Sequence, residues 1–209
     1  MGNYEKPDFW SIKAQKEHYP ARSIYKLKEI DEKFGFFKSA PRIHNSLRVL
    51  DLGAAPGSWS LYVLRRQRGP LFLAAVDLLP LSGQFDGYGG DTFFFIQGDF
   101  TGEQVRNELT GLGPYSAIIS DAAPATTGSR TVDTQRSIAL AEEAFSYAEK
   151  CLAPGGNLAV KVFQGSGTAE LLTYLKRRFT SAKSFKPAAS RGSSFETYFL
   201  GLGKSNNEG

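Results

Sequence analysis

One stretch, Arg48-Val-Leu-Asp-Leu-Gly-Ala-Ala-Pro-Gly-Ser-Trp-Ser60, fixes how the rest of this sequence is interpreted. An apolar run up to Leu52 ends in small residues from Gly53 to Gly57, and a helical pattern follows from Trp59. This order predicts a buried strand that turns sharply into a helix. Glycines let a ligand approach the backbone, and the helix N-terminus presents unpaired N–H groups to that ligand. The stretch therefore predicts a nucleotide-type cofactor site at the carboxyl end of a central strand.

The same residues narrow the choice of cofactor. A phosphate-binding P-loop would need a lysine after Gly57, and a dinucleotide fingerprint would need a glycine at Ala55, so the sequence fits neither motif. The turn suits S-adenosylmethionine, which has no phosphate and ends in a zwitterionic methionine. Asp77 ends the next apolar run, 20 residues after Gly57, where a carboxylate that binds ribose hydroxyls is expected. The alternative is an ordinary tight turn of an α/β protein.

Length and composition set the broad class. The chain has 209 residues, of which 41% are hydrophobic, and this fits one globular α/β domain. The net charge of +4 permits a polyanionic partner without requiring one. One cysteine and two histidines argue against a disulfide framework and against a metal site. No signal peptide or membrane-length apolar run is evident, so we expect a cytoplasmic protein without a membrane partner.

The first 48 residues carry the whole excess of positive charge, with 10 Lys and Arg against 6 Asp and Glu. Residues 1–20 are predicted to be a polar N-terminal arm, extended or loosely helical. Ile24, Leu27, Ile30 and Phe34 share one face of a predicted helix that stops at Gly35. The segment is either a solvated amphipathic helix that covers the sheet or a basic arm beside an RNA path.

Further strands and helices alternate along the rest of the chain. Strands are predicted at 71–77, 92–97, 115–121, 157–164 and 195–200, and helices at 101–109, 133–152 and 168–179. The glycine-rich stretch 81–90 is predicted to be a loop. Asp99 and Asp121 follow two of the strands. Asp99 could accept a hydrogen bond from the adenine amino group, or it could belong to the N-cap region of the next helix.

Lys161 lies inside an apolar strand pattern, where an isolated ammonium group is costly. A buried lysine tends to lose its proton, which makes Lys161 a candidate base. The alternative is a lysine on an edge strand whose amine reaches water. Residues 177–191 contain five basic side chains, and the sequence has no acidic residue from 177 until Glu196. This basic stretch could bind phosphates.

The sequence resembles the FtsJ family of RNA ribose 2′-O-methyltransferases from about Arg22 to Leu202. The resemblance is carried by Tyr25-Lys26-Leu27, Asp51 to Ser60, Asp77-Leu-Leu-Pro80, Gln97-Gly-Asp-Phe100, Ser120-Asp-Ala-Ala-Pro124, Lys161-Val-Phe-Gln-Gly165, and Ser190-Arg191 to Glu196. It implies a class I methyltransferase fold of the α/β class. That fold is Rossmann-like, with a mostly parallel seven-stranded sheet, helices on both faces and an antiparallel last strand. The methyltransferase domain would span 21–204, followed by a C-terminal tail at 205–209.

The family's motifs also imply roles for residues of this chain. The family's Lys-Asp-Lys-Glu tetrad corresponds to Lys26, Asp121, Lys161 and Glu196, with Lys161 as proton acceptor. The implied contacts to S-adenosylmethionine are Gly53, Gly57, Trp59, Asp77, Asp99 and Asp121. The implied reaction is 2′-O-methylation of a ribose, with uridine expected, in ribosomal RNA of the large ribosomal subunit, by a monomer without metal.

Other function classes fit less well. A base N-methyltransferase would need an aromatic residue in the loop Asp121-Ala-Ala-Pro124 to stack on a flipped base, and the loop has none. A cytosine-C5 methyltransferase would need a cysteine nucleophile in the pocket, whereas Cys151 is predicted at a helix end. Two alternatives stay open. The chain could methylate another RNA such as tRNA, or it could be a catalytically silent RNA-binding factor of ribosome assembly.

Overall fold

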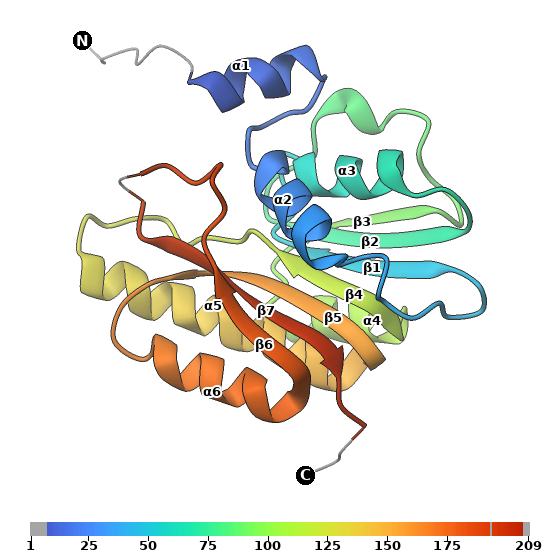
Figure 1. The fold of residues 1–209 in the computed structure, drawn as a ribbon. Coiled ribbons are helices and arrows are strands. Elements are labelled where there is room, and N and C mark those ends of the chain that lie inside the picture. Colours follow the sequence, from blue (N-terminus) through green and yellow to red (C-terminus); the bar gives the residue numbers. More distant parts are fainter. Residues whose placement is uncertain (1–7, 193, 207–209) are drawn as a thin grey trace.

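The computed structural model describes residues 8–192 and 194–206, which form a seven-stranded sheet with helices on both faces (Figure 1). The strand order is β3-β2-β1-β4-β5-β7-β6. β7 is antiparallel to β5 and to β6, and the pairs among β1 to β5 are parallel. The strands are β1 Leu47–Leu52, β2 Leu71–Asp77, β3 Phe93–Gln97, β4 Tyr115–Ser120, β5 Leu152–Phe163, β6 Phe179–Phe185 and β7 Glu196–Lys204.

Two hydrophobic clusters sandwich the sheet, because successive side chains of a strand point to opposite faces. Val49 of β1 packs into the cluster below α2 and α3, and its neighbour Leu50 packs into the cluster below α4, α5 and α6. The helices are α1 Phe9–Lys16, α2 Ile24–Phe34, α3 Ser58–Arg66, α4 Glu103–Gly111, α5 Arg130–Cys151 and α6 Thr168–Arg178, with a short 3-10 turn, η1, at Gly83–Phe85.

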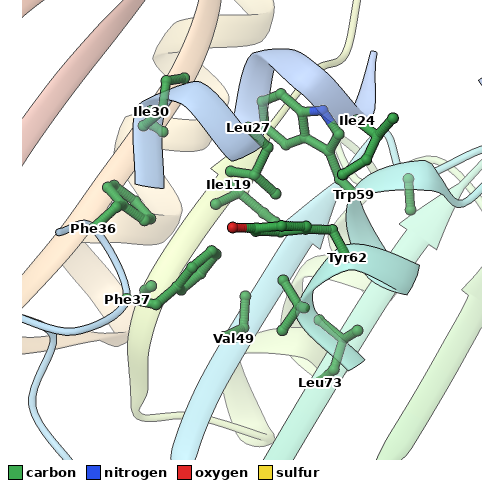
Figure 2. Packing of buried hydrophobic residues seen from close by; sticks show 14 of the residues in the cluster. Ile24, Leu27, Ile30, Phe36, Phe37, Val49, Trp59, Tyr62, Leu73 and Ile119 are labelled. Carbon is green, nitrogen blue, oxygen red and sulfur yellow. The ribbon is translucent and has the colours of Figure 1, made fainter. Parts of the chain in front are cut away.

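The first cluster locks α2 against α3, which carries the small-residue turn at its N-terminus. Ile24, Leu27 and Ile30 of α2 are almost fully buried, as the periodicity of the sequence predicts (Figure 2). Each such side chain contributes about 1.5–3 kcal/mol to folding by leaving water. The helix ends at Gly35, whose φ of 60° is favourable for glycine. This packing fixes the position of any polar side chain on α2.

The fold confirms the predicted class and most of the elements, but one strand was missed. The segment 179–185 was not predicted as a strand, yet it forms the edge strand β6. The described part of the predicted arm takes the helical one of its two predicted forms. It contains α1, and Trp10 of that helix packs on Tyr25 of α2 with ring centroids 4.9 Å apart. Residues 1–7 and 207–209 of the predicted arm and tail lie outside the described residues.

The order of the strands reverses between β1 and β4, which pair directly. The chain adds β2 and β3 on one side of β1, and it adds β5 and the later strands on the other side of β4. Ligands of open α/β sheets bind at such a point, outside the carboxyl ends of the strands. Among the helices that the structure describes, none is both long and apolar enough to cross a membrane.

Candidate active site

Lys161 projects from the central strand β5 toward the carboxyl end of β4. Its Nζ lies 3.0 Å from Oδ1 of Asp121 and also donates to the backbone carbonyl of Asp121. Only 8% of Lys161 is exposed. The strand is flanked by β4 and β7, so Lys161 is not the edge-strand lysine that we considered as an alternative. The burial cost of its ammonium group is offset by a direct carboxylate partner.

Lys26 and Glu196 form a second ion pair at the same edge. Nζ of Lys26, on the first turn of α2, lies 2.6 Å from Oε1 of Glu196, the first residue of β7. Glu196 is buried and paired, so it is not the plain solvent-facing residue that the sequence also allowed. In the antiparallel register Lys161 opposes Tyr198, two residues from Glu196.

Tyr198 connects these groups and was missed as a site residue in the sequence. Its hydroxyl donates to Oδ1 of Asp121 at 2.5 Å, and Nζ of Lys26 lies 5.8 Å from the centre of its ring. The sequence could have indicated Tyr198, because residues two apart on a strand share a face and Tyr198 follows Glu196 by two on β7. Tyr198 thereby ties Asp121, and through it Lys161, to the ion pair formed by Lys26.

The two lysines keep Asp121 ionised. Burial by itself would raise the pKa of the Asp121 carboxyl, but the charges of Lys161 and Lys26 outweigh it and hold the pKa below its usual value. Burial raises the pKa of Tyr198 well above its ordinary value, so the tyrosine remains a hydrogen-bond donor to that carboxylate. The site thus brings together two amines, two carboxylates and a phenol, which two ion pairs and one hydrogen bond connect.

Asp77 holds the small-residue turn in place. Its Oδ2 accepts the backbone N–H of Ala55 at 2.9 Å, and its Oδ1 accepts that of Leu79 at 2.9 Å. Each carboxylate oxygen has a second lone-pair direction, and Asp77 is partly exposed at the end of β2. The carboxylate can therefore accept two further donors, such as the hydroxyls of a ribose, while it shapes the turn.

Asp51 lies beneath this turn and is 1% exposed. Its Oδ2 accepts the Ser60 hydroxyl at 2.7 Å, whereas its buried Oδ1 has no hydrogen-bond partner in the described part of the chain. Burial raises the pKa of Asp51 to about 7, the Ser60 hydrogen bond opposes this, and the nearby charges of Asp121 and Asp77 add to the rise. An unpartnered buried carboxylate oxygen is costly, and a cationic ligand above the turn would reduce this cost.

Asp51 is expected to make the free energy of unfolding depend on pH when no cofactor is added. The folded-state pKa of about 7 exceeds the ordinary 3.8, so the folded protein holds this proton while the unfolded chain releases it. The contribution of Asp51 to stability is therefore present below about pH 4 and is lost as the pH rises to about 7. Asp51→Asn should raise the melting temperature at pH 8 relative to wild type and change it little at pH 4. An equal shift at both pH values in thermal unfolding would contradict this role.

Gly53 and Gly57 adopt φ values of 76° and 108°, which favour glycine. A Cβ on Gly53 would lie 2.6 Å from Cβ of Ala122, and one on Gly57 would lie 2.3 Å from the ring of Phe85. The side that a Cβ would occupy is thus filled by the protein itself. The approach of a ligand to the backbone of these glycines stays a prediction. The two glycines allow the turn after β1 to pack closely against Ala122, which follows β4, and against Phe85 of η1. This packing supports the side of the turn that a Cβ would otherwise occupy.

Trp59 does not offer its side chain to a ligand. The indole is 2% exposed and lies beside Ile24 and Leu27 of α2 (Figure 2). Its Nε1 donates to the carbonyl of Ser23 at 2.8 Å. The hydroxyl of Ser58 accepts the N–H of Ala21 and donates to its carbonyl. The two residues therefore anchor the start of α2, and hence Lys26, to the turn. A cofactor contact by Trp59 would have to come from its backbone N–H in the first turn of α3.

Asp99 lies at the same edge of the sheet but is exposed. Its Oδ1 accepts both the N–H and the hydroxyl of Thr101 at 2.8 Å, a turn that precedes α4. This favours the local capping alternative for the ligand-free protein. The second carboxylate oxygen can still receive a donor such as an adenine amino group.

The charge at this edge discriminates between cofactors. Four carboxylates lie in or just after the carboxyl ends of the strands there, which disfavours the phosphates of a dinucleotide; they belong to Asp51, Asp77, Asp99 and Asp121. S-Adenosylmethionine carries a positive sulfonium and a positive ammonium group, so the residues present fit it. Among the described residues no cluster of three or more His, Cys, Asp or Glu could hold a metal ion.

Comparison with known proteins decides the family. The family model described as FtsJ-like methyltransferase matches residues 19–204. The chain belongs to the FtsJ-like methyltransferase family. A relative from Treponema denticola, named ribosomal RNA large subunit methyltransferase E, is 48% identical over 95% of this chain and 96% of its own length. A relative of the same name from Nitratidesulfovibrio vulgaris strain Miyazaki F is 43% identical over 94% of both chains.

A solved structure agrees with this membership. A Plasmodium falciparum chain described as a ribosomal RNA methyltransferase superposes with a TM-score of 0.73 and 27% identity, covering 89% of this chain and 98% of that one. The chain is therefore an FtsJ-like methyltransferase with the Rossmann-like fold that its sequence predicts. The tetrad residues, although distant in sequence, meet at one edge of that fold.

Proposed function

We propose that this FtsJ-like methyltransferase transfers a methyl group from S-adenosylmethionine to a ribose 2′-hydroxyl of large-subunit ribosomal RNA, with uridine as the nucleotide. The observation that carries the proposal is the buried pairing of Lys161 with Asp121 beside that of Lys26 with Glu196. The names of the Treponema and Nitratidesulfovibrio relatives support a ribosomal RNA substrate.

The cofactor would lie across the switch point between β1 and β4. Asp77 would hold its ribose hydroxyls, the backbone of Gly53, Gly57 and Trp59 would border its methionine, and Asp99 would face its adenine. Asp121 would lie beside the methionine and would carry a second role through Lys161. When bound, S-adenosylmethionine supplies an activated methyl group on a positively charged sulfur.

The residues of the chain then have to align the acceptor and remove one proton. The 2′-oxygen would attack the methyl carbon with the sulfur as leaving group. Lys161 would enter this step as the neutral amine, after its ammonium group has released a proton to water, and its Nζ would then take the hydroxyl proton. Asp121 and Tyr198 orient that amine, and the Lys26–Glu196 pair adjoins them and would position the ribose. The products are a 2′-O-methyl ribose, S-adenosylhomocysteine and a proton on Lys161.

The nucleophilic-cysteine alternative has little physical support. Cys151 ends α5 and is 6% exposed. It packs beside Gly113, which precedes β4, and so lies at the opposite end of that strand from Asp121. Burial raises the pKa of its thiol to about 12. A protonated, buried thiol is a poor nucleophile.

The substrate assignment is tested with radiolabelled S-adenosylmethionine and a panel of RNAs. The panel holds large ribosomal subunits from a strain that lacks the corresponding methyltransferase, the naked ribosomal RNA from them, and tRNA. We expect label in large-subunit RNA. Label in tRNA alone would favour the second substrate class. Tight binding to the subunits without label would favour an RNA-binding assembly factor without turnover.

A further inference from the structure

A pocket of about 420 Å³ opens beside the Lys26–Glu196 pair, between the start of α2 and the connection from β6 to β7. Lys26 and Glu196 belong to its lining, and so do Arg22 and Arg191. Arg22 lies two residues before α2, and Arg191 lies in the connection that leads to Glu196. The pocket therefore joins the tetrad to two guanidinium groups.

The charges that line this pocket are unbalanced. Lys26, Arg22 and Arg191 are positive, and Glu196 is the only acidic residue among the described lining residues. Glu196 is already paired with Lys26, and Arg22 pairs with Asp8 from outside the lining, so Arg191 contributes the positive charge that no described lining carboxylate offsets. Burial lowers the pKa of Arg22, and the charge of Arg191 lowers it further. An anion that both guanidinium groups contact would relieve their repulsion.

We propose that this pocket binds the phosphodiester group next to the ribose that receives the methyl group, with Arg22 and Arg191 as its ligands. The inference rests on the proposed function, because it assumes that the acceptor ribose lies at the tetrad. Guanidinium groups present paired N–H donors that match two phosphate oxygens. The pocket reaches Lys26 and Glu196, so a phosphate held there would fix the adjoining ribose near them.

Arg22 already has an acidic partner within the chain, the carboxylate of Asp8. The Asp8 carboxylate, at the N-cap of α1, forms an ion pair with Arg22, whose other amino group donates to the carbonyl of Ala189. This pair links α1, the helix set apart from the sheet in Figure 1, to the rim of the pocket. An RNA phosphate would have to compete with this carboxylate for Arg22, so the Asp8–Arg22 pair opposes RNA binding.

The test measures how the full chain binds a large-subunit ribosomal RNA fragment at a series of KCl concentrations. Arg191→Gln removes an exposed charge, and Arg22→Gln removes the partly buried one. Each should weaken binding several-fold and reduce the slope of log affinity against log salt by about 0.7–0.9, the effect of one lost phosphate contact. The KM for RNA should rise, while the affinity for S-adenosylmethionine stays within about twofold of wild type. Arg191→Lys should restore the slope.

Two further variants sharpen the test. Arg68→Gln makes the same charge change on an exposed residue before β2, at the opposite edge of the sheet, and should leave the slope unchanged. Asp8→Asn removes the competing charge, and asparagine still caps α1 by accepting the N–H of Ser11. Asp8→Asn should therefore tighten RNA binding.

The outcomes separate this inference from the proposed function. A slope for Arg191→Gln equal to that of Arg68→Gln, or weaker binding by Asp8→Asn, would overturn the phosphate site even if the wild-type protein methylates RNA. A wild-type protein that binds the fragment with the predicted arginine-dependent slope but transfers no methyl group would support the phosphate site and contradict the proposed function.

Discussion

Replacing Lys161 with alanine is expected to slow methyl transfer about 10²–10⁴-fold, the range for loss of a positioned proton acceptor. The amine is the group that would take the proton from the attacking hydroxyl, and it is buried against Asp121. The affinity for S-adenosylmethionine should stay within a few-fold of wild type. Single-turnover kinetics with saturating cofactor, together with calorimetry, measure the two effects separately.

Lys161→Arg distinguishes proton transfer from charge. Arginine keeps a positive charge beside Asp121, but its guanidinium group does not lose its proton in proteins and so cannot accept another. We expect Lys161→Arg to be almost as slow as Lys161→Ala. Lys38→Ala, which removes an exposed amine after α2, is the matched control and should have wild-type rates. Substantial activity in Lys161→Arg would assign Lys161 a purely electrostatic role.

Asp77→Ala is expected to act on the cofactor. The variant would lose charge-assisted hydrogen bonds to the cofactor ribose and also the acceptor that fixes Ala55 and Leu79. A hydrogen bond to a charged group contributes about 1.5–3 kcal/mol, so the dissociation constant for S-adenosylmethionine should rise about ten- to hundredfold. At saturating cofactor the rate of methyl transfer should recover most of its wild-type value, in contrast to Lys161→Ala.

Asp91→Ala provides the control for this measurement. It removes an exposed carboxylate just before β3, at the other end of the sheet from Asp77. Its effect on cofactor affinity should be within about twofold. Calorimetric titration of both variants with S-adenosylmethionine and with S-adenosylhomocysteine gives the comparison. An unchanged affinity in Asp77→Ala would remove Asp77 from the cofactor site.

The central strands and helices could be predicted because their patterns depend on burial. The strand at 71–77 and the helix stop at Gly35 follow from apolar periodicity and from glycine's tolerance of positive φ. β6 could not be predicted in this way. Its sequence, Phe179 to Phe185, is largely polar because it lies at the edge of the sheet, so it lacks the apolar run that marks the inner strands.

The site could be predicted only in part, for a similar reason. Lys161 was identifiable because a charge inside an apolar strand needs a partner. The partner relations themselves depend on tertiary contacts: Tyr198 reaches Asp121 across 77 positions of sequence, and the buried indole of Trp59 turns toward Ser23. The roles of Gly53 and Gly57 also depend on what packs against them, Ala122 and Phe85, and neither neighbour follows from the local pattern.

The proposed reaction places the methyl group on the ribose oxygen beside Lys161. Nuclease digestion of RNA methylated by the wild-type protein, followed by mass spectrometry of the nucleosides, tests this most directly. We expect the added methyl group, which replaces the hydrogen of the 2′-hydroxyl, on the ribose of uridine, and about 10²-fold less of it or lower still with Lys161→Ala at the same reaction time. A methyl group on the base, or one that persists at the wild-type level in Lys161→Ala, would contradict it.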